Sequence, residues 1–522
     1  NTPIWLARQL SVDSFHQLSQ AVCTQRWQEE MHKFVEVFLK YAEKHFADRI
    51  DAYVLASGQT DEWMDYNGAV TCASKEQAYL AWCKKEALPV TGVPSFPLAD
   101  ATAFDGCLYD PSSPNSPVNY WKFNSQIIAD TIVEFAEKAR TIIRPEAEIG
   151  AFYGYIMELD VNRLVKCGHL AYEHLLQSSA IDFTVSPGAY GAREMGEGSG
   201  FMVPHGTVNL YGKRHLHECD QRTHTYNNQL TEFVSYNVPK WQNGVEDVVG
   251  MKREMALALI NHTSLWWFDM WGGFYQEQAI YDNLSQMKKI WDSFAGVAIE
   301  SVAEIALVVD PQSSFMLNDA SFMYGINNHL RNQLNCCGMP FDVYSFNDLP
   351  KLETLNRYKM MIFSSSFEIT PERADFLRKS VLKDNRTVLW LYAPGISDGK
   401  GLNVDRVKNL CGLDFKEPGI VQKDMDGWNT VYCYDYRDIH STVLRDLAIA
   451  AGAHCYVEST EVIYANNRLL ALHTATGGEK QISLPVAYEK IIELYSGKTV
   501  AVNTNTFSCK FEAPDTALFE LR

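Results

Sequence analysis

The sequence predicts an α/β protein of three successive parts, and three patterns along the chain support this fold class. From residue 1 to about 298, amphipathic helices alternate with short apolar segments, as in the repeated β/α units of a TIM barrel. From 299 to 458, continuous apolar strands alternate with helices, which predicts a doubly wound parallel sheet. From 459 to 522 the helices largely stop, and short alternating segments predict a small β-sandwich.

In the first part, each expected strand is a short run of apolar and aromatic residues. The strands are expected at 50–56, 149–156, 181–185, 208–213 and 264–269. The helices are expected at 27–45, 124–140, 165–178 and 246–260, where apolar residues recur with helical spacing.

The second part has strands expected at 305–310, 341–345, 359–364 and 387–392. Its first strand is followed by Asp310-Pro-Gln-Ser-Ser and not by a glycine-rich phosphate loop, so nucleotide binding has no support. A glutamine amidotransferase needs a nucleophilic Cys between strand and helix, but the segment 363–368 offers only serines there. We therefore expect a structural role for this part.

Composition excludes several classes of partner. The net charge of −18 repels nucleic acid phosphates and anionic lipids, and no run of about 18 apolar residues occurs, so we expect neither nucleic acid nor membrane partners. The first residues lack the basic and apolar regions of a signal peptide, which predicts a soluble chain and leaves the compartment open. The twelve cysteines lack zinc-ligand spacing, and we expect no metal and no cofactor.

Two carboxylates follow expected strands, where catalytic residues of β/α barrels lie. Glu62 stands beside Trp63 shortly after the strand 50–56. Glu218 lies in the segment 214–224, in which Glu218, Asp220, Arg222 and His224 share one face if the chain is extended. An ordinary surface strand also alternates polar residues in this way.

Glycoside hydrolysis uses two carboxyl groups, one protonated and one ionised, which lie about 5 Å apart in retaining enzymes. The buried carboxyl beside an aromatic ring is expected to act as acid, and the one beside Arg222 to stay charged and attack the anomeric carbon. Metal-assisted hydrolysis is the competing use of this segment, by His215, His217, Glu218, Asp220 and His224. We favour it less, because alternate residues of one strand splay outward instead of converging on one ion.

Aromatic residues cluster near these expected strand ends, at Tyr153, Tyr155 and 266–271. Aromatic faces pack against the apolar C–H faces of sugar rings, although core packing explains most single aromatic residues.

Several short segments, taken in order, resemble bacterial β-galactosidase-like proteins of glycoside hydrolase family 42 and its relatives, including family 164 β-mannosidases. They are 59–63 (QTDEW), 152–155 (FYGY), 168–170 (GHL), 181–190 with Pro187 and Tyr190, 217–224 (HECDQRTH) and 266–273 (WWFDMWGG). The resemblance continues through 305–310, 333–340 and 388–394, which are similar to that group's flavodoxin-like trimerisation domain. It therefore covers nearly the whole chain.

This resemblance implies a retaining, exo-acting β-glycosidase of terminal β-galactosides or β-mannosides, with Glu62 as acid/base after barrel strand 4 and Glu218 as nucleophile after strand 7. Asp61 stands where clan members usually have the Asn that binds the sugar 2-hydroxyl. The expected substrate-binding residues are Asp61, Trp63, Tyr153, Tyr190, Arg193, Asp220, Arg222, His224, Trp267 and Trp271. The alternative function is that of a non-catalytic, carbohydrate-binding relative.

If 50–56 is barrel strand 4, the roughly 50 residues before it cannot hold three further β/α units of a closed barrel. We therefore expect a five-stranded open barrel with two free edges. Either further residues upstream or another chain would complete it. The resemblance also implies a homo-oligomer, and we expect a trimer before a dimer.

Overall fold

The structure is a computed structural model, and it describes most of the chain. The described residues are 18–58, 61–65, 71–88, 92–94, 103–113, 116–159, 163–226, 240–270, 272–318 and 321–522. Their strands form three main sheets, which confirms the predicted α/β fold class with a TIM-barrel-like first part. We call the parts the barrel region (to residue 298), the second region (299–458) and the C-terminal region (459–522); these predicted boundaries stay predictions.

The barrel region is built on a parallel sheet with the strand order β1-β4-β5-β6-β7. Its strands are β1 (Ala52–Leu55), β4 (Glu148–Phe152), β5 (Phe183–Pro187), β6 (Arg214–Cys219) and β7 (Ser264–Trp267), with a separate hairpin of β2 (Ala103–Phe104) and β3 (Leu108–Tyr109). Its helices are α2 (Leu18–Val22), α3 (Gln25–Phe46), α4 (Ala73–Lys85), α5 (Val118–Arg140), α6 (Arg163–Lys166), α7 (Tyr172–Gln177), α8 (His205–Leu210), α9 (Gly244–Ile260) and α10 (Gln278–Phe294).

Four of the five expected barrel strands are confirmed within a few residues, and the fourth prediction in chain order was wrong. Residues 208–210 belong to α8, and the strand is β6, whose sequence RHLHEC reads as a polar surface segment. Its imidazoles are buried because they have hydrogen-bond partners: His215 lies 3.0 Å from the Thr184 hydroxyl, and His217 lies 3.0 Å from Glu254. The predicted helix 165–178 is divided into α6 and α7.

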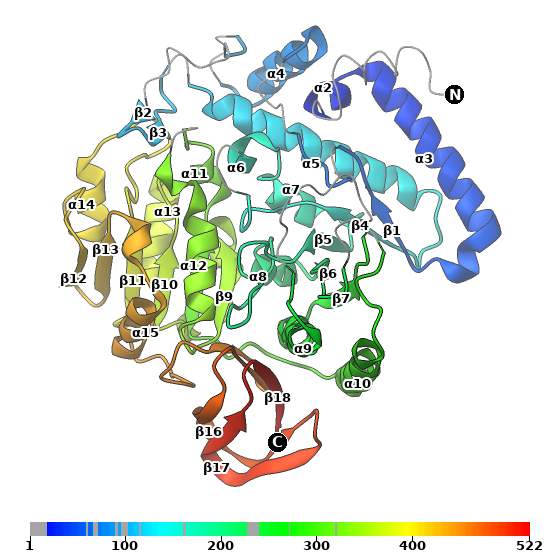
Figure 1. The fold of residues 1–522 in the computed structure, drawn as a ribbon. Helices are drawn as coiled ribbons and strands as arrows, with labels where there is room; N and C mark the ends of the chain where they lie inside the picture. The colour runs from blue at the N-terminus through cyan, green and yellow to red at the C-terminus, as the bar shows by residue number, and fades with distance from the viewer. Residues whose placement is uncertain are drawn as a thin grey trace.

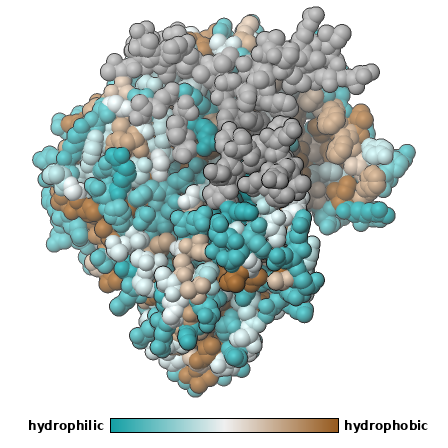
Figure 2. All heavy atoms as spheres, viewed as in Figure 1, coloured by the Kyte–Doolittle hydropathy of each residue, from teal (hydrophilic) through white to brown (hydrophobic). Residues whose placement is uncertain are grey.

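The described part of the barrel sheet is open, with β1 and β7 at its edges. Helix α3 beside it carries an exposed apolar stripe of Phe34, Val37, Phe38 and Tyr41, which are between 51% and 70% exposed. Figure 2 shows apolar surface on the right of the molecule, where α3 lies in Figure 1. The open sheet agrees with the predicted open barrel, whereas the exposed stripe on α3 was not predicted.

The second region is a six-stranded sheet with the order β12-β13-β11-β10-β8-β9, parallel except for β12. Its strands are β8 (Ile305–Val309), β9 (Phe341–Ser345), β10 (Met360–Phe363), β11 (Thr387–Leu391), β12 (Ile420–Asp424) and β13 (Asn429–Cys433). Its helices are α11 (Pro311–Ser314), α12 (Ile326–Asn335), α13 (Pro371–Phe376), α14 (Asp405–Cys411) and α15 (Ser441–Ala450). All residues of β8, β10 and β11 are buried, as in a sheet covered on both faces.

The C-terminal region is an antiparallel sheet with the order β14-β15-β18-β16-β17 and its own apolar cluster. Its strands are β14 (Val462–Ala465), β15 (Leu469–Thr474), β16 (Gly478–Glu493), β17 (Lys498–Phe511) and β18 (Asp515–Leu521). In Figure 1 it lies at the bottom, below the barrel region and the second region. A single apolar cluster runs through those two upper regions. Among the described residues, no helix has the length and apolarity to cross a membrane.

Candidate active site

The carboxyl ends of the barrel strands bring together side chains from four different segments. Glu62 follows β1, Tyr155 follows β4, Tyr190 follows β5, and Glu218 lies near the end of β6. The strands are parallel, so these ends meet at one edge of the sheet, where β/α barrels place their chemistry.

Glu62 lies in a tight turn, and contacts of the adjacent residue Trp63 hold this turn in place. Asp61 and Trp63 have left-handed backbone φ angles of 64° and 57°, which only a few per cent of non-glycine residues adopt. The Trp63 backbone N–H donates to the Ser57 carbonyl (2.7 Å), and the indole N–H donates to the Leu55 carbonyl (2.9 Å). Trp63 is only 1% exposed, so it is a core anchor of the turn and not the sugar-binding ring that we predicted.

Tyr155 and His169 connect this turn to the segment after β4. The Tyr155 hydroxyl donates to the Glu62 carboxylate (3.0 Å). His169 accepts from the Gly154 N–H (3.2 Å) at Nδ1, so its Nε2 carries the proton and donates to the Glu62 carbonyl (2.9 Å). Burial lowers the pKa of His169 to about 3, which keeps the imidazole neutral in this role.

Tyr155 and His169 were not among the predicted site residues. The available signals were the aromatic Tyr155 near the end of the strand expected at 149–156 and the segment 168–170 in the resemblance, whereas the contact of His169 with the Glu62 turn depends on tertiary structure. The pKa of Tyr155 is raised by burial and then by electrostatic interaction with Glu62, Tyr190 and Glu218, so its hydroxyl stays protonated and donates to Glu62.

Glu218 is 3% exposed, and its surroundings favour the protonated form. Burial, followed by the charges of Asp220 and Glu62, raises its pKa to about 8, although the Arg193 guanidinium opposes this rise. The prediction that Arg222 holds Glu218 charged was therefore wrong. Arg222 packs instead against the rings of Tyr226 and Phe274, 5.5 and 5.8 Å from their centroids.

Arg193 pairs with Asp220 behind the site. Its Nη2 donates to the Asp220 carboxylate (2.5 Å) and to the Gly188 carbonyl (2.7 Å), and its guanidinium lies 4.5 Å from the centroid of the Tyr190 ring. Arg193 and Asp220 are buried, whereas Tyr190 is 50% exposed. This arrangement supports Tyr190 from below and leaves one of its faces accessible.

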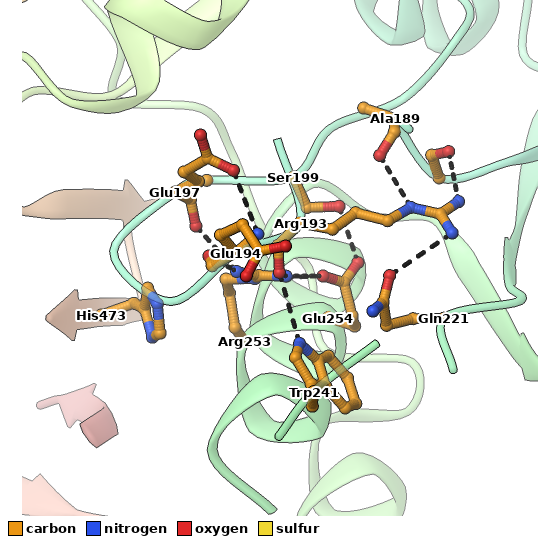
Figure 3. A network of polar contacts seen from close by, with 12 residues as sticks. Ala189, Arg193, Glu194, Glu197, Ser199, Gln221, Trp241, Arg253, Glu254 and His473 are labelled. Atoms are coloured by element: carbon orange, nitrogen blue, oxygen red, sulfur yellow. Dashed lines mark hydrogen bonds and ion pairs between the residues drawn. The ribbon is translucent and has the colours of Figure 1, made fainter. Parts of the chain in front are cut away.

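A second buried ion cluster is formed by Glu254, Arg253 and Ser199, which Figure 3 shows, together with His217 of β6. Burial alone would raise the pKa of Glu254, but Arg253 and His217 outweigh it and lower the pKa to about 2. Glu254 therefore stays charged and accepts from Arg253 (2.8 Å), from His217 (3.0 Å) and from the Ser199 hydroxyl (2.9 Å). The cluster fixes the outward-facing side of the strand that carries Glu218.

Two further predicted binding residues make other contacts. The Tyr153 hydroxyl is buried and donates to the Gly168 carbonyl (2.6 Å), so Tyr153 is a core residue. His224 contacts the carboxylates of Asp247 and Glu277, and the first of these contacts contributes most to raising its pKa. In the part of the chain that the structure describes, no three His, Cys, Asp or Glu side chains are grouped to hold a metal ion.

The aromatic segment at β7 contains Trp266 and the predicted sugar-binding residue Trp267. Trp266 pairs in register with Glu218, and residues so paired on parallel strands point to the same face of the sheet. Trp266 is 38% exposed, whereas Trp267 is half-buried with its ring edge against Tyr275 at 6.2 Å. We therefore assign Trp266 to the Glu218 face; Trp271 lies outside the described residues.

Replacing Tyr155 with Phe should lower kcat/KM about tenfold, with retention of the fold, because the Glu62 carboxylate loses its hydrogen-bond donor. The limb of the pH–rate profile that reports Glu62 should move to higher pH, because the Tyr155 hydroxyl of the wild type stabilises the ionised form of Glu62 and the variant lacks it. Tyr153→Phe removes a hydroxyl that does not reach Glu62 and is the matched control. Equal profiles for the two variants would contradict the role of Tyr155.

Replacing Glu218 with Gln should stabilise the protein at high pH. The folded-state pKa of about 8 exceeds the ordinary 4.5, so the wild type loses stability as pH rises from about 4.5 through about 8. The variant cannot ionise there, and its advantage in unfolding free energy should reach a few kcal/mol, at about 1.4 kcal/mol per pKa unit. Thermal melts at pH 4 and pH 9 measure it, with Glu479→Gln on exposed β16 as control. If the stability advantage of Glu218→Gln over the wild type became smaller with rising pH, a raised pKa of Glu218 in the folded protein would be contradicted.

Comparisons with known proteins bear on the fold. No protein-family model and no curated protein sequence matches the chain. Among solved structures, it is similar to the β-galactosidase from Bacillus circulans sp. alkalophilus, with a TM-score of 0.67 and 12% identity over 100% of this chain and 87% of that one. It is also similar to the β-galactosidase from Rahnella sp. R3, with a TM-score of 0.61 and 11% identity over 99% and 87%. This chain has the fold of these β-galactosidases.

A third similar structure is the β-galactosidase from the psychrophilic Marinomonas ef1, with a TM-score of 0.59 and 10% identity over 96% and 84% of the two chains. The predicted resemblance to this group is confirmed at the level of the fold. At these identities the likeness extends to the arrangement of the chain and not to the reaction.

Proposed function

We propose that the protein is a retaining, exo-acting β-glycosidase that hydrolyses terminal β-galactosides or β-mannosides. The observation that carries the proposal is the meeting of Glu62 and Glu218 at the carboxyl edge of the barrel sheet, with Tyr155 in electrostatic contact with both. Two carboxyl groups across one pocket are the requirement of double displacement. We expect their separation to be about 5 Å, as retention requires.

In this proposal Glu218 attacks the anomeric carbon and Glu62 protonates the leaving oxygen, then takes a proton from the water that releases the sugar. Such a site needs one proton shared between two carboxyl groups. The raised pKa of Glu218, to which the charge of Glu62 contributes, supports a site that holds one proton near neutral pH.

The free protein also supports a reversed assignment of the two glutamates. Burial favours a protonated Glu218, and the Tyr155 O–H favours a charged Glu62, so Glu218 would serve as acid and Glu62 as nucleophile. We retain Glu218 as nucleophile because it is placed on the seventh strand in the resemblance described above. Variants of the two glutamates distinguish the assignments.

Tyr190 and Trp266 are the accessible rings beside the two carboxyl groups, and we propose that they pack against the sugar. Asp61 is exposed next to Glu62 and is proposed to bind the sugar 2-hydroxyl. Hydrolysis of nitrophenyl β-galactoside and β-mannoside, followed by proton NMR of the first sugar released, tests the proposal. A first product with β configuration supports retention, an α product indicates inversion, and no turnover of either substrate leaves the carbohydrate-binding alternative.

We also propose that the protein works as a homo-oligomer, a trimer before a dimer. Contacts between subunits would bury the open edges of the described barrel sheet and the exposed apolar stripe on α3. Light scattering that finds an active monomer at sub-micromolar concentration would refute it.

A further inference from the structure

The loop 188–201 between β5 and α8 contains glycine at every second position from Gly196 to Gly200. A Cβ atom built on Gly196 would lie 2.9 Å from the Cβ of Ala475, one on Gly198 would lie 2.4 Å from the Cβ of Asn335, and one on Gly200 would lie 2.6 Å from Cδ of Arg331. Ala475 belongs to the C-terminal region, and the other two partners belong to α12 of the second region. The glycines therefore mark the place where all three regions meet.

Hydrogen bonds hold the loop at the same points. The Gly196 N–H donates to Nε2 of His473 (2.8 Å), and Asn335 donates to the Ser199 carbonyl (2.8 Å). The Tyr464 hydroxyl donates to the Gly198 carbonyl. Each bond joins the loop to a region other than the barrel.

Two hydrogen bonds of the His473 ring fix its tautomer. Because Nε2 accepts from Gly196, Nδ1 carries the proton and donates to the Thr516 hydroxyl (2.8 Å), which in turn donates to the Val249 carbonyl of α9 (3.0 Å). The imidazole is buried, and burial keeps it neutral by lowering its pKa. The chain of bonds thus runs from α9 through the C-terminal sheet to the loop.

On the barrel side, Arg253 donates to the carbonyls of Glu194 (2.8 Å), Glu197 (2.9 Å) and Arg193 (3.1 Å), as Figure 3 shows. The same loop carries Tyr190 and Arg193, which support the proposed sugar site. Helix α12 contacts the neighbouring segment as well, because Arg331 donates to the Met157 carbonyl (3.0 Å) and pairs with Glu158 (2.9 Å), which accepts from the Tyr190 N–H (3.0 Å).

We propose that the second and C-terminal regions are positioning elements of the active site, which clamp the loop 188–201 at Gly196, Gly198 and Gly200 and so hold Tyr190 and Arg193 against the sugar. Asn335, Arg331 and His473 are the positioning residues. This inference rests on the proposed glycosidase function, and it gives the accessory regions a role within one chain in addition to any role between subunits.

A size-swap experiment tests the clamp. Gly198→Ala, made in the full chain, should raise KM for an aryl β-glycoside or lower kcat/KM about tenfold to a hundredfold, because the new methyl group displaces the loop from Asn335. Gly198→Ala combined with Asn335→Gly should recover part of the loss, because the second change removes the side chain that the methyl group meets and also removes the hydrogen bond to the Ser199 carbonyl. Gly191→Ala lies in the same loop, meets nothing within 4 Å and is the matched control.

Hydrogen exchange of the Gly196 amide supplies a readout that does not depend on turnover. His473→Leu should speed this exchange about tenfold, whereas His473→Gln, whose side-chain oxygen can accept from Gly196, should stay close to wild type. If the wild type hydrolyses no glycoside, the proposed function fails. If the wild type is active, and Gly198→Ala leaves both kcat/KM and the exchange rate of the Gly196 amide within about twofold of wild type, the clamp is refuted.

Discussion

Replacing Glu218 with Gln should abolish turnover of every substrate, with kcat reduced by at least about 10⁴-fold. The amide cannot form the covalent bond to the anomeric carbon, and the neighbouring carboxylate of Asp220 is held by Arg193. The loss should be equal for good and poor leaving groups, because bond formation to the nucleophile precedes release of either.

Initial rates on dinitrophenyl and methyl glycosides measure this loss, with circular dichroism as a check of the fold. Asp220→Asn is an informative companion, because it removes a neighbouring carboxylate that does not attack the sugar. It should lower activity far less, although it leaves Arg193 with a neutral partner. A Glu218→Gln variant that keeps more than about 1% of wild-type activity would rule out Glu218 as nucleophile.

Replacing Glu62 with Gln should produce a loss that depends on the leaving group. A dinitrophenolate departs without protonation, so the first step should be nearly unaffected, whereas a poor leaving group should react about 10²- to 10⁴-fold more slowly. The second step should then limit turnover, because no base activates water.

Azide needs no general base, and it should restore turnover of Glu62→Gln by attacking the glycosyl-enzyme to give a β-glycosyl azide. A β-azide product from Glu218→Gln would instead reverse the roles of the two glutamates, as the protonation of the free protein allows.

The buried strands were predictable from sequence because their apolar runs are continuous. The strands β8, β10 and β11 fall within the expected segments, since a strand covered on both faces has no polar alternation to obscure it. The edge hairpin of β12 and β13 was not predicted, because its outer strand is partly exposed and has the composition of a loop.

The strand β6 shows why the site itself was harder to place. Its buried histidines are satisfied by Thr184 and Glu254, which are distant in sequence, so the segment looks like a surface. Both predicted catalytic glutamates nevertheless lie where the strands end. Contacts between residues distant in sequence could not be predicted. Arg193, and not Arg222, interacts with Glu218, and the Trp63 side chain is buried with its indole N–H bonded to the Leu55 carbonyl.

The alternate spacing of Gly196, Gly198 and Gly200 was not part of the sequence-based predictions. Three alternate glycines in a loop do not indicate a helix or a strand. Their small size is explained only by the close approach of α12 and the C-terminal sheet in the folded structure. Side-chain contacts between regions are the information that local patterns lack.

The most direct test of the central claim is to identify the residue that carries the sugar after reaction with a dinitrophenyl 2-deoxy-2-fluoro-β-glycoside, which slows release of a covalent intermediate. Mass spectrometry of the digested protein should place the fluorosugar on the peptide that contains Glu218, one sugar per chain. A label on Glu62, or a protein that hydrolyses aryl β-glycosides yet never carries the label, would contradict the account.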